Sequence, residues 1–249
     1  MSDLKILTLD IETSPNLCYT WGLWQQNIPI AMIVEPTKVL SWAAKWLGKK
    51  KIMYRDVNDK DFLTTIHELI DSADAVVHYN GTAFDMKHLN REFVEAGLDP
   101  PLMPRDIDLL KTVRQRFKYP SNKLDYVADR LLGEKKGDTG GFATWIGCLN
   151  GERWAWRKMK KYNIQDVALT EKLYLHIRGW IKGHPNCGLY VEDQENPVCR
   201  NCGSTHLQTR GWQQLNVRSY MRYKCMDCGW NGRGRKMVKG GKNSPQVIV

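Results

Sequence analysis

The sequence predicts an α/β fold, in which a mixed sheet is flanked by helices, followed by a small C-terminal β module. Strand-like segments come first, and helix-like segments then alternate with strands, an order typical of a mixed sheet covered by helices. Hydrophobic residues make up 42% of the 249 residues, which is ordinary for a globular core. Two Cys-x-x-Cys pairs near the C-terminus indicate a separate small module that a metal ion would stabilise.

Strand candidates open the chain. Residues 4–13 alternate between apolar and polar side chains, as in a strand with one buried face. Further segments rich in Trp, Ile and Val follow, separated by Pro, Asn and Gly. They are residues 17–24, 30–34, 38–43 and 52–55.

Helices and one further strand occupy the middle of the chain. Apolar side chains on one helical stripe predict a helix over residues 59–72, and residues 75–79 form a short apolar strand. Gly97 and Gly133 mark two of the later helix ends, because glycine readily takes the conformation that terminates a helix. The later helices are predicted over residues 84–96, 107–117 and 123–132. Residues 134–151 are predicted to be loop-rich, and residues 152–181 to form one long helix or two joined ones.

Positive charge is concentrated at the C-terminal end. The formal net charge is +10, and residues 197–249 carry 10 basic side chains against 1 acidic one, whereas residues 1–196 carry 27 against 26. A basic module beside a nearly neutral body predicts a polyanionic partner, nucleic acid above all. The alternative is a basic tail that only improves solubility.

The domain limits follow from these shifts in composition. We expect a first domain over residues 1–182, a linker over 183–197, the metal module over 198–236 and a flexible basic tail over 237–249. No apolar run is long enough to span a membrane, and no secretory signal is visible, so we expect a cytoplasmic protein of a bacterial or phage-infected cell. In that compartment paired cysteines favour metal binding over disulfides.

Acidic residues near the ends of two predicted strands are candidate metal ligands. Asp10 and Glu12 are two residues apart on a strand and therefore share a face, while Ile11 points into the core. Carboxylates of this kind suit Mg²⁺ or Mn²⁺. Asp85 begins the helix that follows the strand over residues 75–79, where Gly81 permits a tight turn and Phe84 would anchor the loop in the core. The alternatives are an exposed polar strand end for the first pair and a plain helix cap for Asp85.

A third motif lies in the long C-terminal helix. Tyr162 and Asp166 are four residues apart and share a helix face. Asp166 could hold a metal ion while the Tyr162 hydroxyl orients a water molecule. The alternative is a buried tyrosine and a solvated aspartate without chemical roles.

Taken in chain order, Asp10-Ile11-Glu12, the segment ending at Asp85, and Tyr162-Asn163-Ile164-Gln165-Asp166 resemble the three motifs of the DEDD superfamily of 3′-5′ exonucleases. With Tyr162 the third motif is similar to that of the branch that carries Tyr at this position, a branch that includes proofreading domains of many DNA polymerases. Residues 106–108 and 122–133 are similar to the segment linking the second and third motifs.

The resemblance covers roughly residues 1–182. It implies an RNase H-like fold, metal ligation by Asp10, Glu12, Asp85 and Asp166, and hydrolysis of a terminal phosphodiester with two Mg²⁺ or Mn²⁺ ions. The Trp-rich residues 19–47 are not explained by the general pattern and look more like phage and bacterial relatives.

The two cysteine pairs form a strong zinc signature. Each pair is followed by glycine, and 22 residues separate the pairs, a spacing that suits two knuckles around one tetrahedral Zn²⁺. The module resembles a zinc ribbon, and because it is too small to bury a core of its own, one structural Zn²⁺ would supply its stability. The expected ligands are Cys199, Cys202, Cys225 and Cys228. His206 is a possible substitute ligand.

Aromatic and basic side chains are interleaved in two places, a pattern that suits base stacking together with phosphate contacts. The rival interpretations are an amphipathic helix with a solvated basic face for residues 153–161, and a protein-docking surface for the ribbon. The predicted nucleic-acid-binding residues are Trp154, Arg157, Lys160, Arg210, Trp212, Arg218, Arg222, Arg233 and Arg235.

The remaining candidates have structural explanations. We expect His78 and His88 to serve the fold, and Cys18, Cys148 and Cys187 to be thiols without chemistry.

The whole pattern predicts a two-metal 3′-5′ exonuclease acting on DNA, with a zinc ribbon that aids binding. DNA is favoured over RNA by the resemblance alone. The alternatives are an exoribonuclease, a structure-selective nuclease on the same fold, and a non-catalytic nucleic-acid-binding protein.

Overall fold

A computed structural model describes residues 4–24, 27–191, 196–215 and 218–237. The chain divides into two compact units, Lys5–Tyr174 and Leu175–Val249, the second joined by Met1–Leu4. The division falls inside a long helix, so the domain limits expected from the sequence stay a prediction. Part of the predicted linker, residues 192–195, and nearly all of the predicted tail lie outside the described residues.

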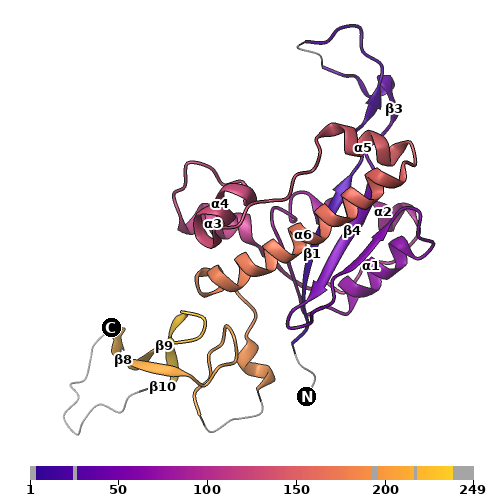
Figure 1. The fold of residues 1–249 in the computed structure, drawn as a ribbon. Coiled ribbons are helices and arrows are strands. Elements are labelled where there is room, and N and C mark those ends of the chain that lie inside the picture. The colour runs from indigo at the N-terminus through magenta and orange to yellow at the C-terminus, as the bar shows by residue number, and fades with distance from the viewer. Residues whose placement is uncertain (1–3, 25–26, 192–195, 216–217, 238–249) are drawn as a thin grey trace, which may run out of the picture. The chain divides into compact units, whose positions relative to one another are not determined.

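A five-stranded mixed sheet forms the centre of the first unit (Figure 1). Its strand order is β5-β4-β1-β6-β7; β5, β4 and β1 are antiparallel neighbours, whereas β1, β6 and β7 run parallel. The mixed sheet confirms the predicted fold class. The strand bounds are β1 Ile6–Thr13, β4 Val39–Trp46, β5 Met53–Asp56, β6 Ala75–His78 and β7 Arg105–Asp108.

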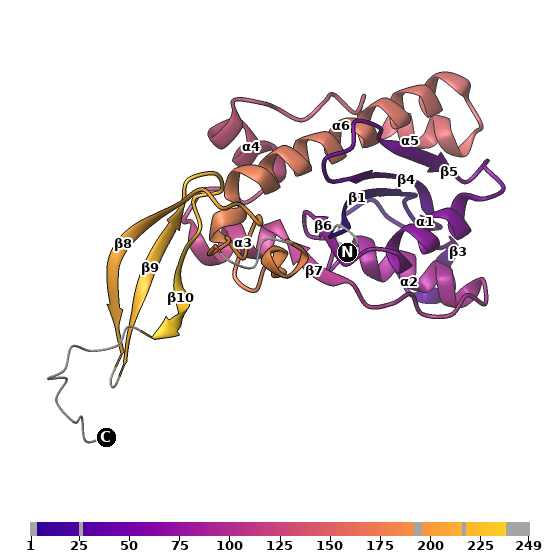
Figure 2. The same cartoon turned by 90° about the horizontal axis from the view of Figure 1, so that it is seen from below.

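Helices cover both faces of this sheet, α1 and α2 on one side and α6 on the other (Figure 2). Because side chains alternate along a strand, Leu7, Leu9 and Ile11 of β1 pack in the core cluster that includes α1 and α2. Asp10 and Glu12 therefore face α6. The helix bounds are α1 Phe62–Asp71, α2 Asp85–Glu95, α3 Leu109–Arg116, α4 Leu124–Leu132, α5 Phe142–Leu149 and α6 Arg153–Ile177.

Two strand predictions near the N-terminus were wrong in extent. The strand expected over residues 17–24 is only β2, Leu17–Cys18, because its partner β3, Ile33–Glu35, pairs with those two residues and no more. The segment expected over residues 30–34 begins as a 3-10 turn, in which the Met32 amide donates to the Pro29 carbonyl at 2.9 Å.

Two predictions in the middle of the chain were also wrong. The helix expected from residue 107 starts at Leu109; the residues before it form β7, and the Asp108 side chain caps the helix by accepting from the Leu110 amide. The loop-rich stretch contains α5. Its Gly147 allows close packing, since a Cβ there would lie 2.7 Å from that of Ala155. The long helix is a single element, α6.

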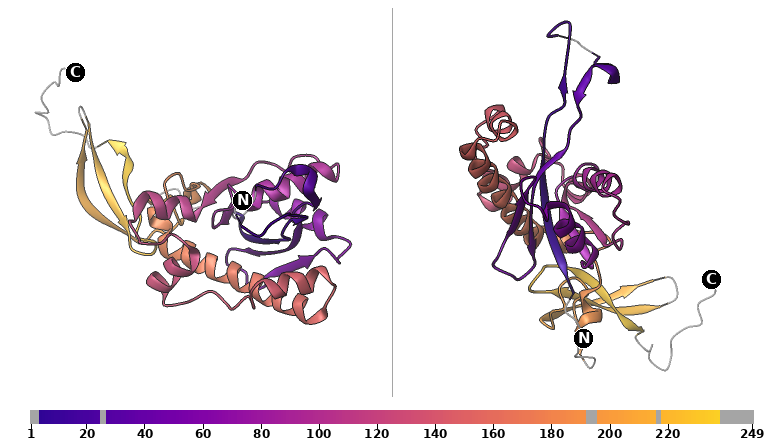
Figure 3. Two further views of the ribbon diagram at one scale, coloured as in Figure 1. Left: turned by 90° about the horizontal axis from the view of Figure 1, so that it is seen from above. Right: turned by 90° about the vertical axis from the view of Figure 1, so that its right-hand side faces the viewer.

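The second unit is built around a three-stranded antiparallel sheet in the order β10-β9-β8, visible in Figure 3. Its strands are β8 Leu207–Gln214, β9 Ser219–Cys225 and β10 Asn231–Met237. The described part of the predicted linker packs on the first cysteine knuckle: the Cys187 amide donates to the Arg200 carbonyl at 2.7 Å. In the described part of the chain, no helix combines the length and the hydrophobicity needed to cross a membrane.

Candidate active site and metal centres

Three carboxylates converge between β1 and α6. Asp10 and Glu12 project from the α6-facing side of β1, and Asp166 lies on the sheet-facing side of α6 with 1% of its surface exposed. Each offers a ligand oxygen, and these oxygens lie within 4.8 Å of one another. The fold thus brings residues from the first and third motifs together. This arrangement does not match the alternative of an exposed strand end for Asp10 and Glu12, or that of a solvated Asp166.

Asp85 lies beside this group but is not one of the three. It starts α2 and is buried, and its Oδ1 accepts a hydrogen bond from the Ile11 amide at 3.1 Å. This bond ties Asp85 to β1 at Ile11, the residue between Asp10 and Glu12. Asp85 therefore does more than cap its own helix. Metal ligation by Asp85 stays a prediction.

The carboxylates share an environment that disfavours their charge. Burial, followed by the charge of Asp85, holds the pKa of Asp10 well above its usual range. Burial and the charge of Asp166 raise the pKa of Glu12 to about 8, and burial raises the pKa of Asp85 to about 6. Asp166 Oδ1 is buried without a hydrogen-bond partner among the described residues. The site therefore combines hard carboxylate oxygens, whose negative charge is disfavoured, with a buried oxygen that lacks a hydrogen-bond partner. This combination fits a divalent cation.

Lys136 is a site residue that the sequence did not reveal. It lies between α4 and α5, and its Nζ is 2.6 Å from Asp166 Oδ2 and donates to the Tyr162 hydroxyl at 2.9 Å. Burial opposes its charge, but the Asp166 carboxylate outweighs that effect and raises the pKa of Lys136. The residue comes from a glycine-rich loop without a motif, so no sequence signal identified it.

Tyr162 is held from two sides. Lys136 Nζ also lies 5.1 Å from the centre of its ring, and the Trp145 ring of α5 meets it edge-on at 6.5 Å. Burial, followed by the charge of Asp166, raises the pKa of the Tyr162 hydroxyl. The hydroxyl therefore keeps its proton at neutral pH and can donate a hydrogen bond, which favours an orienting role over that of a base.

Asn163 is the second residue that sequence reasoning missed. It is fully buried, and its Nδ2 donates to Asp10 Oδ2 at 2.7 Å and to the Asp10 carbonyl at 3.2 Å. Its Oδ1 accepts from the Ser41 hydroxyl at 3.3 Å. The spacing 163, 166, 167, 170 on the buried side of α6 is a signal that could have found it.

The loop before Asp85 differs from expectation in one respect. Phe84 does not anchor it in the core: the residue is 38% exposed, and its ring packs edge-on against that of His88, with the ring centres 4.6 Å apart. The buried anchor is His78, whose Nδ1 accepts from the Gly81 amide at 3.0 Å while its Nε2 lies 2.6 Å from Asp106 Oδ1. His78 thus has a structural role, as expected.

The four knuckle cysteines form a second candidate metal centre. The Sγ atoms of Cys199 and Cys228, and those of Cys202 and Cys225, are 3.6 Å apart. A tetrahedral ion with bonds of about 2.3 Å has ligand atoms about 3.8 Å apart, so the cluster is compatible with one divalent ion. His206 is not in the cluster; its Nδ1 lies 3.0 Å from Asp227 Oδ1.

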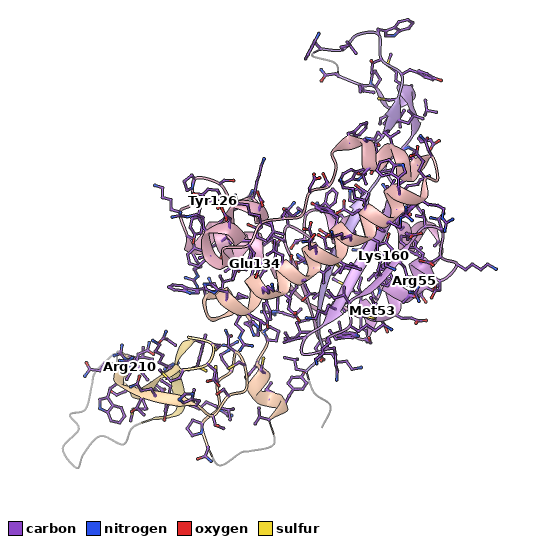
Figure 4. The ribbon with its side chains drawn as sticks, viewed as in Figure 1. Met53, Arg55, Tyr126, Glu134, Lys160 and Arg210 are labelled. Atoms are coloured by element: carbon purple, nitrogen blue, oxygen red, sulfur yellow. The ribbon has the colours of Figure 1, made fainter. Side chains whose placement is uncertain are left out.

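The predicted nucleic-acid-binding residues are exposed on both units. Figure 4 shows Lys160 on α6 beside β5, and its Nζ lies 5.3 Å from the Tyr54 ring centre. Trp156, by contrast, packs in a core cluster, so α6 is amphipathic here. In the second unit Arg233 lies 4.2 Å from the centre of the Tyr220 ring, and Arg222 donates to the Arg210 carbonyl. Nucleic-acid contacts by these residues stay a prediction.

The comparisons with known proteins agree with the fold. A family model described as RNase_H superfamily matches residues 7–178, which is more than half of the chain and includes Asp10, Asp85 and Asp166. A search of curated proteins finds no match. The fold of this superfamily is usually that of a nuclease. The mixed sheet, the carboxylate cluster between its central strand and α6, and the family match together show that this chain belongs to the RNase H superfamily.

Proposed function

We propose that the protein is a metal-dependent 3′-5′ exonuclease that hydrolyses terminal phosphodiesters of DNA. The observation that carries the proposal is the convergence of Asp10, Glu12 and Asp166 within 4.8 Å, with Tyr162 one helical turn before Asp166. Tyr162 is the residue that distinguishes the tyrosine branch of these exonucleases, so the activity and its direction follow from that resemblance.

Two Mg²⁺ or Mn²⁺ ions are the proposed cofactors at this site. The residues that would hold them are Asp10, Glu12, Asp85 and Asp166. When bound, the ions supply the activation of a water molecule and the stabilisation of the leaving 3′-oxygen.

The surrounding side chains hold this ligand set in place. Asn163 fixes one oxygen of Asp10, and the Ile11 amide fixes one oxygen of Asp85. The Tyr162 hydroxyl retains its proton and can donate to, and orient, a water molecule or a phosphate oxygen. Lys136 offsets part of the negative charge of the cluster.

The second unit is proposed to bind one structural Zn²⁺ through its four cysteines and to hold the nucleic acid. Exposed arginines on β8, β9 and β10 support the second role. Docking of a protein partner is the alternative for this surface. The preference for DNA over RNA rests on the resemblance to polymerase proofreading domains.

The test is digestion of a 5′-labelled single-stranded DNA and the matching RNA with Mg²⁺ or Mn²⁺. We expect a ladder that shortens from the 3′ end of the DNA and that Asp10→Ala abolishes. Glu68→Gln, an exposed acidic residue on α1, serves as the matched control and should leave the ladder unchanged.

Each alternative has its own outcome in this assay when branched DNA substrates are included beside the single strands. A ladder from the RNA alone would indicate an exoribonuclease. Internal fragments from branched substrates, without terminal shortening, would indicate a structure-selective nuclease. Binding without cleavage of any substrate would leave a non-catalytic nucleic-acid-binding protein.

A further inference from the structure

Residues 14–24 and 27–38 belong to an arm between β1 and β4 that the proposed function does not explain. The arm has a firm base: the Ser14 amide donates to the Lys38 carbonyl at 2.8 Å, and the Lys38 amide donates to the Ser14 hydroxyl at 2.9 Å. The right-hand view of Figure 3 shows the arm extending away from the sheet. Its first residue follows Glu12 by only two positions, so it starts at the edge of the carboxylate site.

The outer part of the arm exposes large aromatic side chains. Above the short β2–β3 ladder the Tyr19 amide still donates to the Met32 carbonyl at 3.0 Å, and the Thr20 hydroxyl then donates to the Gly22 carbonyl in a turn. Tyr19 is 78% exposed, Trp21 93% and Trp24 83%. Such a concentration of exposed apolar surface marks an interaction site.

The arm lacks the charge that a phosphate backbone would require. Residues 14–34 contain no Asp, Glu, Lys or Arg. At the base, Lys38 Nζ lies 3.8 Å from Glu35 Oε2, so the one cation there has an anionic neighbour. An aromatic, uncharged surface suits the faces of nucleic-acid bases, which stack on aromatic rings regardless of sequence.

We propose that the arm stacks on unpaired bases of a single-stranded substrate whose 3′ end lies at the carboxylate cluster. This inference rests on the proposed function, because it requires a nucleic acid at that site. The reach is adequate: Trp21 is nine residues beyond Glu12, and that length of extended chain spans at most about 30 Å. Bases within a duplex have no free faces, so the arm would select single strands.

The test is the affinity for a fluorescein-labelled single-stranded oligonucleotide, measured by anisotropy in an Asp10→Ala background so that the probe is not degraded. Trp21→Ser combined with Trp24→Ser should weaken binding roughly 100-fold, about tenfold for each ring. The slope of log affinity against log salt should not change, because no phosphate contact is removed. For a blunt duplex the loss should be much smaller.

Val94→Ser is the matched control, because Val94 is a 72% exposed apolar residue on α2. It should change the affinity less than twofold. Trp21→Phe keeps an aromatic face and should retain most of the affinity, which separates stacking from misfolding of the arm. The thermal midpoints of all variants should match that of the parent.

Unchanged affinity in the double variant, or a reduced salt slope, would overturn the proposal. The proposal would also fail if the double variant turned a dimeric protein into a monomer while its affinity for the oligonucleotide stayed constant. That result would indicate that the arm contacts a second copy of the chain. If the arm variants weaken binding but the wild-type protein cleaves no substrate, the arm proposal stands and the exonuclease proposal fails. If the wild-type protein cleaves DNA but the arm variants bind it as tightly as the parent, the exonuclease proposal stands and the arm proposal fails.

Discussion

At the scale of single residues, the electrostatics of the site depend on Lys136. Three carboxylates share a small, partly buried volume, in which Glu12 and Asp166 disfavour the charge of Asp10, and Asp166 disfavours that of Glu12. The Lys136 ammonium is in direct contact with Asp166 and keeps 29% of its side chain exposed. Lys136 thus stabilises the carboxylate cluster before any cation binds.

Replacing Lys136 by Met should make the folded protein more dependent on divalent ions. We expect the free energy of unfolding to fall by about 2 kcal/mol without added metal, less than for a fully buried pair because Lys136 is partly exposed. Mn²⁺ should raise the thermal midpoint of the variant more than that of the wild type. Lys135→Met is the control, since Lys135 is 72% exposed. Equal effects of the two substitutions would contradict the assigned role.

At the scale of elements, the connection from β6 to α2 positions Asp85 through a close contact. Gly81 lies against His78 so tightly that a Cβ would be 2.3 Å from the imidazole ring. His78 is itself buried and held beside Asp106 of β7. The start of α2, and with it Asp85, is therefore fixed by packing against the parallel half of the sheet.

Gly81→Ala should destabilise the protein by about 1–3 kcal/mol, because the added methyl group overpacks a buried site. The measurement is thermal or urea unfolding of Gly81→Ala, His78→Ala and the double variant. If the clash is the cause, the glycine substitution costs less in the His78→Ala background, giving a measurable coupling energy. Strict additivity would show that the contact with His78 is not responsible.

In the small sheet, strand alternation places three side chains of β9 on one face: Tyr220, Arg222 and Lys224. Arg233 of β10 is the cross-strand partner of Arg222. Replacing Arg222 and Arg233 by Gln should weaken DNA binding and reduce the magnitude of the salt slope by about 1 for each arginine. Arg130→Gln, an exposed change on α4, is the control. An unchanged slope would show that other residues make the phosphate contacts.

At the scale of the whole molecule, the chain consists of two compact units with different sources of stability. The first has a buried core on both faces of its sheet. The second has a thin sheet whose β8 is almost entirely exposed, and we expect its order to depend on a metal ion held by the cysteine cluster. A metal-free second unit should therefore unfold without the first.

Cys202→Ser tests this independence. We expect the variant to lose its bound zinc, measured by elemental analysis, and to lose one of two unfolding transitions. Cleavage of short substrates should persist, because the carboxylate site lies wholly in the first unit. Cys18→Ser, outside the cluster, should keep its zinc. Unfolding of the whole chain in the Cys202 variant would contradict the two-unit description.

The sequence alone was sufficient for features whose signal is local. Alternation in β1 put Asp10 and Glu12 on one face, the helical spacing aligned Tyr162 with Asp166, and two short cysteine pairs identified the second candidate metal centre. Each of these patterns follows from the regular geometry of a strand or a helix over a few residues. A short stretch of sequence is therefore enough to recognise it.

Only the tertiary structure decided how distant parts complete the site. Asn163 contacts Asp10 across 153 positions, Lys136 reaches Asp166 from a loop, and the Ile11 amide holds Asp85 across 74 positions. The helix α5 depends on packing of Gly147 against Ala155 at the start of α6, and the short β2–β3 ladder depends on pairing of Leu17 with Glu35. Such contacts carry no periodic or motif signal, because they form only when separate elements of the fold come together.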